Sequence, residues 1–482
     1  MRRKTSALTA TAVTAALALG ASAPASADAT APGDARPGAE SAGDRLFPYL
    51  GNGGYDVESY DVSFDYRPAS TTMRSAVRIS ASATQELSAF SLDSAGQTVH
   101  TVAVDGLPAR FAVRGEKLLI TPRYPIRKRA RFRVDIRFTT DRAARIPSPA
   151  SPGSPSNLDA WYNKDDGFAL FGQPDRAHMF FPMNDYPADK AKATFRVTVP
   201  NGLQVAANGT LRSRTTSAGR TTYVYGTRDP IPTQVVQVAV GHFRRIRQTG
   251  PHGLPLNSHV TTGSYDRAKP FVDLVPSQIA WVEREIGAAY PYEAYGVLGV
   301  KGGYAAAFES AGLSTFSAEA GLTKPEETPT MVHELVHQYF GDAVSEKSWD
   351  DMWISEGHAT YYTFRYKDML GLEPYAEAVR RAYVYDEDNR GITGPPGRLK
   401  DPLDVLGSTN APGFLMLHGL RLKVGDAAFR AIERTFFERY RHKAASTQDF
   451  IDVADEVSGR DLAPYIRSWI YGDKTPPMPA AS

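Results

Sequence analysis

The sequence predicts an α+β protein with two domains, a β domain over residues 45–248 and an α/β domain over residues 249–478. Up to about residue 245, apolar and polar residues alternate with a period of two, which is typical of half-buried strands. After Gly250 the apolar residues recur at helical spacing instead. A chain of 482 residues is also long enough to bury the cores of two or more domains.

The first 27 residues have the three parts of a secretion signal. Arg2, Arg3 and Lys4 make a basic start, a run of small apolar residues covers 7–20, and Ala25-Ser26-Ala27 fits a cleavage site. The apolar run is too short to span a membrane. We therefore expect residues 1–27 to be a signal peptide, residues 28–44 to be a flexible lead-in, and the mature protein to be secreted.

Composition narrows the possible partners. The chain has no cysteine, which excludes disulfides and a lipoprotein anchor. A net charge of +2 with 22% charged residues indicates neither nucleic-acid nor membrane-surface binding. No segment after the signal is apolar enough to span a bilayer, so no membrane span is expected in the mature protein.

The β domain is predicted from alternation in several segments. Clear examples are 60–66, 131–138 and 195–199, where aromatic and β-branched residues occupy every second position. Asn208-Gly209 separates two such runs and predicts a hairpin turn.

The second domain is predicted to be mainly helical. Residues 271–286 form an amphipathic pattern that ends before Tyr290-Pro291. A charged stretch rich in Gly and Pro over 380–402 is predicted to be a loop. Further helices are expected around 414–424, 426–440, 447–456 and 462–470.

The chemistry is concentrated in His333-Glu334-Leu335-Val336-His337. Histidines four residues apart lie on one face of a helix and can both bind one metal ion, while Glu334 lies beside the ion as a general base. Glu356 follows His337 after eighteen intervening residues and supplies a third ligand from the next helix, leaving one position for water. The alternative to a metal site is a histidine pair that arises by chance, and the presence of Glu356 as a third ligand argues against it.

The run from His333 to Tyr362 resembles the aminopeptidase N family of zinc metallopeptidases, in its short secreted bacterial type. The matching motifs are His-Glu-Leu-Val-His-Gln-Tyr-Phe-Gly-Asp and Trp-Asp-Asp-Met-Trp-Ile-Ser-Glu-Gly over 349–357. The resemblance implies one zinc per chain held by His333, His337 and Glu356. It also implies a saddle-like N-terminal β domain and a thermolysin-like catalytic domain. The large C-terminal helical domain of longer members has no room in this sequence.

The resemblance also implies residues that bind the substrate. Ala306-Ala307-Phe308-Glu309-Ser310 stands where the family has G-A-M-E-N, whose glutamate binds the free α-amine of the substrate. Glu309 is retained, and an amine cation in a partly dry cleft needs such a fixed carboxylate; a solvated glutamate at the end of a strand is the alternative reading. Gln173 lies in a segment similar to the one that reaches the same amine, although a plain loop residue is the alternative reading. Asp350 and Asp351 are candidate partners of the ligating imidazoles, with helix capping as the alternative.

One position departs from the family pattern. The family has a tyrosine whose hydroxyl stabilises the oxyanion, in a Y-x-x-G context before an apolar helix, and here Asn410 occupies that place before Gly413. Loss of one oxyanion donor costs about 10²–10³ in turnover. Either Tyr383 or Tyr385 supplies the hydroxyl, Asn410 acts with a water, or catalysis is attenuated.

These expectations describe a secreted zinc aminopeptidase that acts on peptides with a free N-terminus. Glu334 is the expected base, Asn410 the residue at the oxyanion position, and Glu309 with Gln173 the amine-binding pair. The alternatives are a zinc endopeptidase, which would also cleave N-blocked peptides, and a zinc-holding homologue with attenuated catalysis.

Overall fold

The computed structural model describes residues 35–150, 160–164, 167–301 and 307–480. The predicted signal peptide at 1–27 lies outside these residues, as does the first part of the predicted lead-in. From Ala35 onward the lead-in is ordered, contrary to the prediction for 35–44. Arg36–Pro37 form strand β1, and the Asp44 carboxylate accepts hydrogen bonds from the backbone of Leu46 and Phe47.

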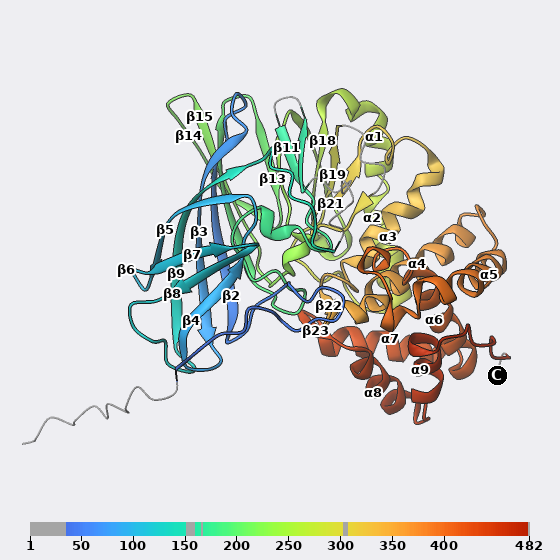
Figure 1. Cartoon of the computed structure of the whole chain (residues 1–482). Helices are drawn as coiled ribbons and strands as arrows, with labels where there is room; N and C mark the ends of the chain where they lie inside the picture. Colours follow the sequence, from blue (N-terminus) through green and yellow to red (C-terminus); the bar gives the residue numbers. More distant parts are fainter. Residues whose placement is uncertain (1–34, 151–159, 165–166, 302–306, 481–482) are drawn as a thin grey trace, which may run out of the picture. The chain divides into compact units, whose positions relative to one another are not determined.

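The N-terminal domain is a β domain, as the alternating pattern predicted, and its described residues form three sheets. The first has eight strands in the order β14-β15-β12-β2-β3-β9-β5-β6, and the other two have the orders β1-β4-β8-β7 and β10-β11-β16-β13. Figure 1 shows these strands in blue to green. Their bounds are β2 Tyr55–Asp65, β3 Thr72–Ala83, β4 Leu87–Asp93, β5 Gln97–Val104, β6 Leu107–Pro108, β7 Arg110–Arg114, β8 Lys117–Thr121, β9 Arg131–Asp141, β10 Trp161–Lys164, β11 Gly167–Leu170, β12 Lys192–Pro200, β13 Gln204–Ala207, β14 Thr210–Ser217, β15 Arg220–Gly226 and β16 Val238–Gly241.

Alternation sets which side chains enter the core. In β9, Phe132, Val134, Ile136 and Phe138 are buried, while the arginines between them are exposed. The predicted hairpin at Asn208-Gly209 is wrong, because β13 and β14 on either side of it belong to different sheets. Asn208 is instead buried, and its side chain bonds the backbone of Gln237 and Ala311.

The second domain begins with a mixed five-stranded sheet in the order β17-β18-β19-β21-β20. Its first strand starts at Phe243, so the sheet begins a few residues before the predicted boundary at 248. Strands β18, β19 and β21 run parallel, and β20 lies antiparallel at the edge. The bounds are β17 Phe243–Thr249, β18 Pro255–Thr261, β19 Val297–Val300, β20 Ala307–Phe308 and β21 Ser314–Ser317.

Helices make up most of the remaining domain and appear in yellow to red in Figure 1. A short parallel pair, β22 (Val344–Glu346) and β23 (Lys443–Ala445), lies among them. None of the helices in the described ranges combines the length and apolar character needed to cross a bilayer. Their bounds are α1 Tyr265–Val272, α2 Val275–Ile286, α3 Thr328–His337, α4 Trp353–Met369, α5 Tyr375–Thr393, α6 Asn410–Val424, α7 Asp426–Tyr440, α8 Thr447–Ser458 and α9 Ala463–Tyr471.

The predicted loop over 380–402 is wrong in its first half, where helix α5 continues to Thr393. This helix is largely exposed and buries few apolar side chains, so its sequence lacks the apolar stripe of a core helix. It is held instead by polar contacts such as that of buried Arg390, which donates to the carbonyls of Trp469 and Gly472.

Candidate metal centre and active site

Two histidines of α3 and one glutamate of α4 converge on a single point. His333 and His337 lie one helical turn apart, and the Glu356 Oε2 atom is 3.6 Å from His333 Nε2 and 3.8 Å from His337 Nε2. Two ligand atoms of a tetrahedral zinc ion with bonds of about 2.1 Å are roughly 3.4 Å apart. The three predicted ligands are therefore spaced as a zinc site requires.

Glycines allow the helices to approach closely around this point. A Cβ on Gly357 would lie 2.8 Å from the Cα of Gly413, so α4 and α6 cross in backbone contact. Gly357 follows Glu356 directly, and Gly413 is in the first turn of α6. The crossing therefore brings the N-terminal turn of α6, with Asn410, beside the predicted ligands.

Each histidine is oriented through its second ring nitrogen. His333 Nδ1 lies 3.2 Å from the Thr363 hydroxyl, which itself donates to the carbonyl of Ala359. Thr363 must then accept from Nδ1–H, which leaves His333 Nε2 free to bind a metal. His337 Nδ1 lies 2.9 Å from the Ser355 hydroxyl, and a Cβ on Gly341 would lie only 2.4 Å from that hydroxyl.

The two aspartates considered as partners of these imidazoles lie elsewhere. Asp350 forms an ion pair with Arg45, and Asp351 accepts hydrogen bonds from Thr447 and Ser348. Ser355 and Thr363 hold the imidazoles instead. Both lie close to Glu356 on α4, one residue before it and seven residues after it, but their contacts with the histidines depend on how α3 packs on α4.

Burial and charge suit this pocket to a cation. Burial lowers the pKa of His337 to about 4, so its imidazole is neutral, the form that binds metals. Burial, together with the carboxylates of Glu309, Glu356 and Asp342, raises the pKa of Glu334 well above its usual value. Oxygen atoms of Glu309 and Glu334 lie within 4.8 Å of each other and of a His337 nitrogen. A bound divalent cation would offset this repulsion between carboxylates.

The amine-binding pair predicted from the resemblance is assembled across both domains. Gln173 lies just beyond β11, and its Nε2 donates a hydrogen bond of 2.6 Å to Glu309 Oε1. Glu309 directly follows edge strand β20, and the start of its motif at Ala306 lies outside the described residues. Gln338, next to His337, donates to the Glu309 carbonyl and so fixes this segment to helix α3.

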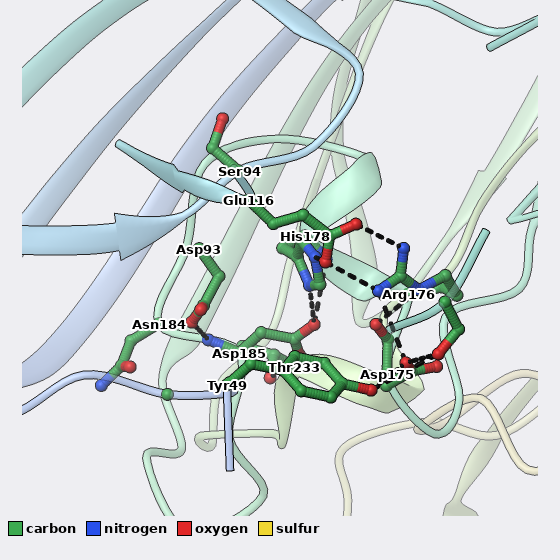
Figure 2. Close-up of polar contacts among 12 residues, drawn as sticks. Tyr49, Asp93, Ser94, Glu116, Asp175, Arg176, His178, Asn184, Asp185 and Thr233 are labelled. Atoms are coloured by element: carbon green, nitrogen blue, oxygen red, sulfur yellow. Dashed lines mark hydrogen bonds and ion pairs between the residues drawn. The ribbon is translucent and has the colours of Figure 1, made fainter. Parts of the chain in front are cut away.

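A buried polar network supports the segment that carries Gln173 (Figure 2). Arg176 donates two hydrogen bonds to Glu116, at 2.9 and 3.0 Å. His178 Nδ1 lies 2.7 Å from Asp185 and its Nε2 lies 3.3 Å from Glu116. Asp175 also accepts from Tyr49. The loop after β11 is therefore fixed by ion pairs with residues outside it.

Asn410, predicted at the oxyanion position, shares a pocket with His333. It is the first residue of α6 and lines a pocket of about 410 Å³ together with His333 and Tyr385. Its Oδ1 is buried without a hydrogen-bond partner among the described residues. Tyr383 points elsewhere and donates to the carbonyl of Pro476, so Tyr385 is the one of the two candidate tyrosines that shares the pocket.

Comparisons with known proteins agree with this arrangement. Residues 56–235 match the Peptidase M1 N-terminal domain, and residues 272–469 match the Peptidase family M1 domain. A probable aminopeptidase 1 of Sulfurisphaera tokodaii is 23% identical over 86% of this chain and 53% of its own length. Aminopeptidase N of Streptomyces lividans is 23% identical over 86% of this chain and 50% of its own length. The chain thus spans about half the length of these relatives.

Solved structures match this chain over a larger share of their own length than these relatives do. An M1 zinc metallopeptidase of Deinococcus radiodurans, bound to a Tyr-Ser-Ala substrate, is 27% identical with a TM-score of 0.82. The match covers 92% of this chain and all of that one. Its fold is the same combination of a β-rich domain and an α/β catalytic domain. With both of its domains matched and its ligand set in place, this chain belongs to the M1 family of zinc metallopeptidases.

Proposed function

We propose that this protein is a secreted zinc aminopeptidase, which removes N-terminal residues from peptides. The observation that carries the proposal is the Gln173–Glu309 pair beside His333, His337 and Glu356. A buried carboxylate next to a hydrolytic metal site provides an anchor for a free α-amine, and so places the first peptide bond at the metal. The aminopeptidases to which the chain is similar support the same activity.

The residues divide the chemistry among them. His333, His337 and Glu356 would hold a zinc ion, which would supply Lewis-acid polarisation of water and of the scissile carbonyl. Glu334 removes a proton from the attacking water and passes it to the leaving amine, which its position beside the metal ligands allows. Glu309 holds the substrate amine, and Gln173 fixes the Glu309 carboxylate by its hydrogen bond.

The test compares aminoacyl amides with free and with acetylated amines. The zinc-loaded protein should cleave the free amines and leave the acetylated ones nearly intact. Glu309→Ala should lower kcat/KM for the free amines by about 30- to 1,000-fold, because it removes a partly desolvated ion pair worth roughly 2–4 kcal/mol. Equal rates on free and acetylated substrates would show an endopeptidase instead.

Asn410 favours a slower enzyme as the second candidate. Its side chain is shorter than the tyrosine that the family has at this position, which leaves the oxyanion with one donor fewer. A zinc-loaded protein that binds peptides and turns them over at a rate close to that of Glu334→Gln would support the attenuated homologue.

Secretion is the remaining part of the proposal and depends on residues 1–27. Their basic start, apolar run and Ala25-Ser26-Ala27 support export and cleavage. Sequencing the N-terminus of protein recovered from culture medium should give Asp28. Full-length protein retained inside the cells would contradict this part alone.

A further inference from the structure

A pocket that shares His333 with the candidate metal site is not lined by the amine-binding pair. It is the pocket of about 410 Å³ formed by α4, α5 and the N-terminal turn of α6, here called the α4–α6 pocket. Its volume is in the range of small-ligand sites, ~300–1,000 Å³. The residues important for the argument are His333, Thr363, Phe364, Lys367, Arg381 and Asn410.

The charged residues that line the α4–α6 pocket are cations. Lys367 Nζ lies 5.3 Å and Arg381 Cζ lies 5.4 Å from the centre of the Phe364 ring, so both are held against one aromatic wall. Glu373 contacts both cations: it lies 3.5 Å from Lys367 and forms an ion pair with Arg381. Glu373 does not line the pocket. Two cations against one carboxylate leave the pocket wall positive.

The direction of a bound peptide follows from the two ends of the site. Its amine is held at Glu309 and its first carbonyl lies at the metal, so the leaving part must extend away from Glu309. Neither Glu309 nor Gln173 lines the α4–α6 pocket, whereas His333 does. The pocket is therefore placed to receive the leaving part.

The distances fit a short leaving part. Thr363 contacts His333, and Lys367 is one turn further along α4, a rise of about 6 Å. An extended residue spans about 3.3–3.6 Å, so two residues beyond the cleaved bond, or one residue with an acidic side chain, bring a carboxylate to this cation. The Tyr-Ser-Ala substrate of the Deinococcus radiodurans enzyme has this length.

We propose that the α4–α6 pocket binds a carboxylate on the leaving part of the peptide, through Lys367 and Arg381. This inference rests on the proposed aminopeptidase function and deepens it. The substrate class is short peptides with a carboxylate one or two residues after the cleaved bond. The carboxylate is either the free C-terminus or an acidic side chain.

The test uses the zinc-loaded protein with four peptides, Leu-Gly-Gly, its C-terminal amide, Leu-Glu-Gly amide and Leu-Gln-Gly amide. Leu-Gly-Gly should exceed its amide in kcat/KM by about tenfold, mainly through a lower KM, and added salt should reduce the difference. Leu-Glu-Gly amide exceeding Leu-Gln-Gly amide would assign the site to an acidic side chain as well. A preference confined to Leu-Gly-Gly would assign it to the C-terminus.

Substitutions connect this preference to the pocket. Lys367→Met should bring the acid-to-amide ratio close to one, and Lys367→Glu should reverse it. Arg434→Met is the matched control, since it removes an exposed cation of the same domain that is paired with Glu438 on α7. Its ratio should remain native.

Binding separates this inference from the proposed function. Calorimetry with the zinc-loaded Glu334→Gln protein measures affinity for Leu-Gly-Gly and its amide without turnover. Tighter binding of the acid supports the pocket even if the native protein hydrolyses nothing. Equal affinity for the two, or a preference that survives Lys367→Glu, would overturn the inference even if aminopeptidase activity is present.

Discussion

The charge of His178 should make the stability of the protein depend on pH. This imidazole is completely buried between Asp185 and Glu116 (Figure 2). Burial lowers its pKa, but the hydrogen bonds to the two carboxylates more than compensate and raise the pKa from 6.5 to about 9. Each pKa unit corresponds to about 1.4 kcal/mol, so the protonated form contributes about 3 kcal/mol to the free energy of unfolding.

The sign follows from which state holds the proton. Between pH 6.5 and 9 the folded protein keeps a proton on His178 that the unfolded chain has released. The contribution is therefore fully present below pH 6.5 and is lost as pH rises through 9. Replacing His178 by glutamine keeps a hydrogen-bonding side chain but removes the charge. The variant should be about 3 kcal/mol less stable than the native protein at pH 6 and should differ much less at pH 9.5.

Urea unfolding at the two pH values, at constant free zinc, measures this difference. Other groups titrate in both proteins and cancel in the comparison. His259→Gln is the matched control, because burial lowers the pKa of His259 to about 4 and its imidazole is neutral at both pH values. Its stability deficit should be the same at pH 6 and 9.5. A His178→Gln deficit that is also independent of pH would refute the charged state of this residue.

Three further predictions concern the metal, the domain contact and the oxyanion. His337→Ala should lose zinc, whereas Glu334→Gln should keep about one zinc per chain and lose most turnover, as metal analysis and rate assays would show. Lys190→Met should lower the free energy of unfolding by roughly 1–3 kcal/mol, because it leaves the carbonyls of Asp342 and Ala343 unpaired. The control is Lys192→Met, at an exposed position, which should leave the free energy of unfolding unchanged. Asn410→Tyr should raise kcat about tenfold or more, because it supplies a hydroxyl to the oxyanion. A large loss of turnover in Tyr385→Phe would show instead that Tyr385 already supplies this hydroxyl.

Local spacing explains why the metal ligands could be predicted from the sequence. His333 and His337 are on one helix, so their separation along the chain determines their separation in space. Glu356 is on the next α-helix, after a connection that contains β22. Strands such as β9 could also be predicted from local spacing. Apolar residues at every second position indicate which face of the strand is buried.

Features that depend on packing between distant segments could not be predicted in this way. Gln173 and Glu309 are 136 residues apart and meet only when both domains are folded. The hydrogen bonds of Ser355 and Thr363 to the histidines depend on how α3 packs on α4. Asn208-Gly209 has the composition of a hairpin turn, but sheet membership, which no local signal reports, separates the strands on either side.

The division of the site between the domains has a consequence for specificity. The catalytic domain alone supplies the proposed metal ligands, the proposed base Glu334 and the cations of the α4–α6 pocket. The N-terminal domain supplies Gln173, whose loop is held by the ion pairs of Arg176 and His178. Hydrolysis as such therefore needs the catalytic domain, whereas the rigid placement of the Glu309 carboxylate needs both. Loosening the N-terminal network should thus weaken the discrimination between free and acetylated amines before it abolishes hydrolysis, because the charge that selects the amine stays in place while its orientation is lost.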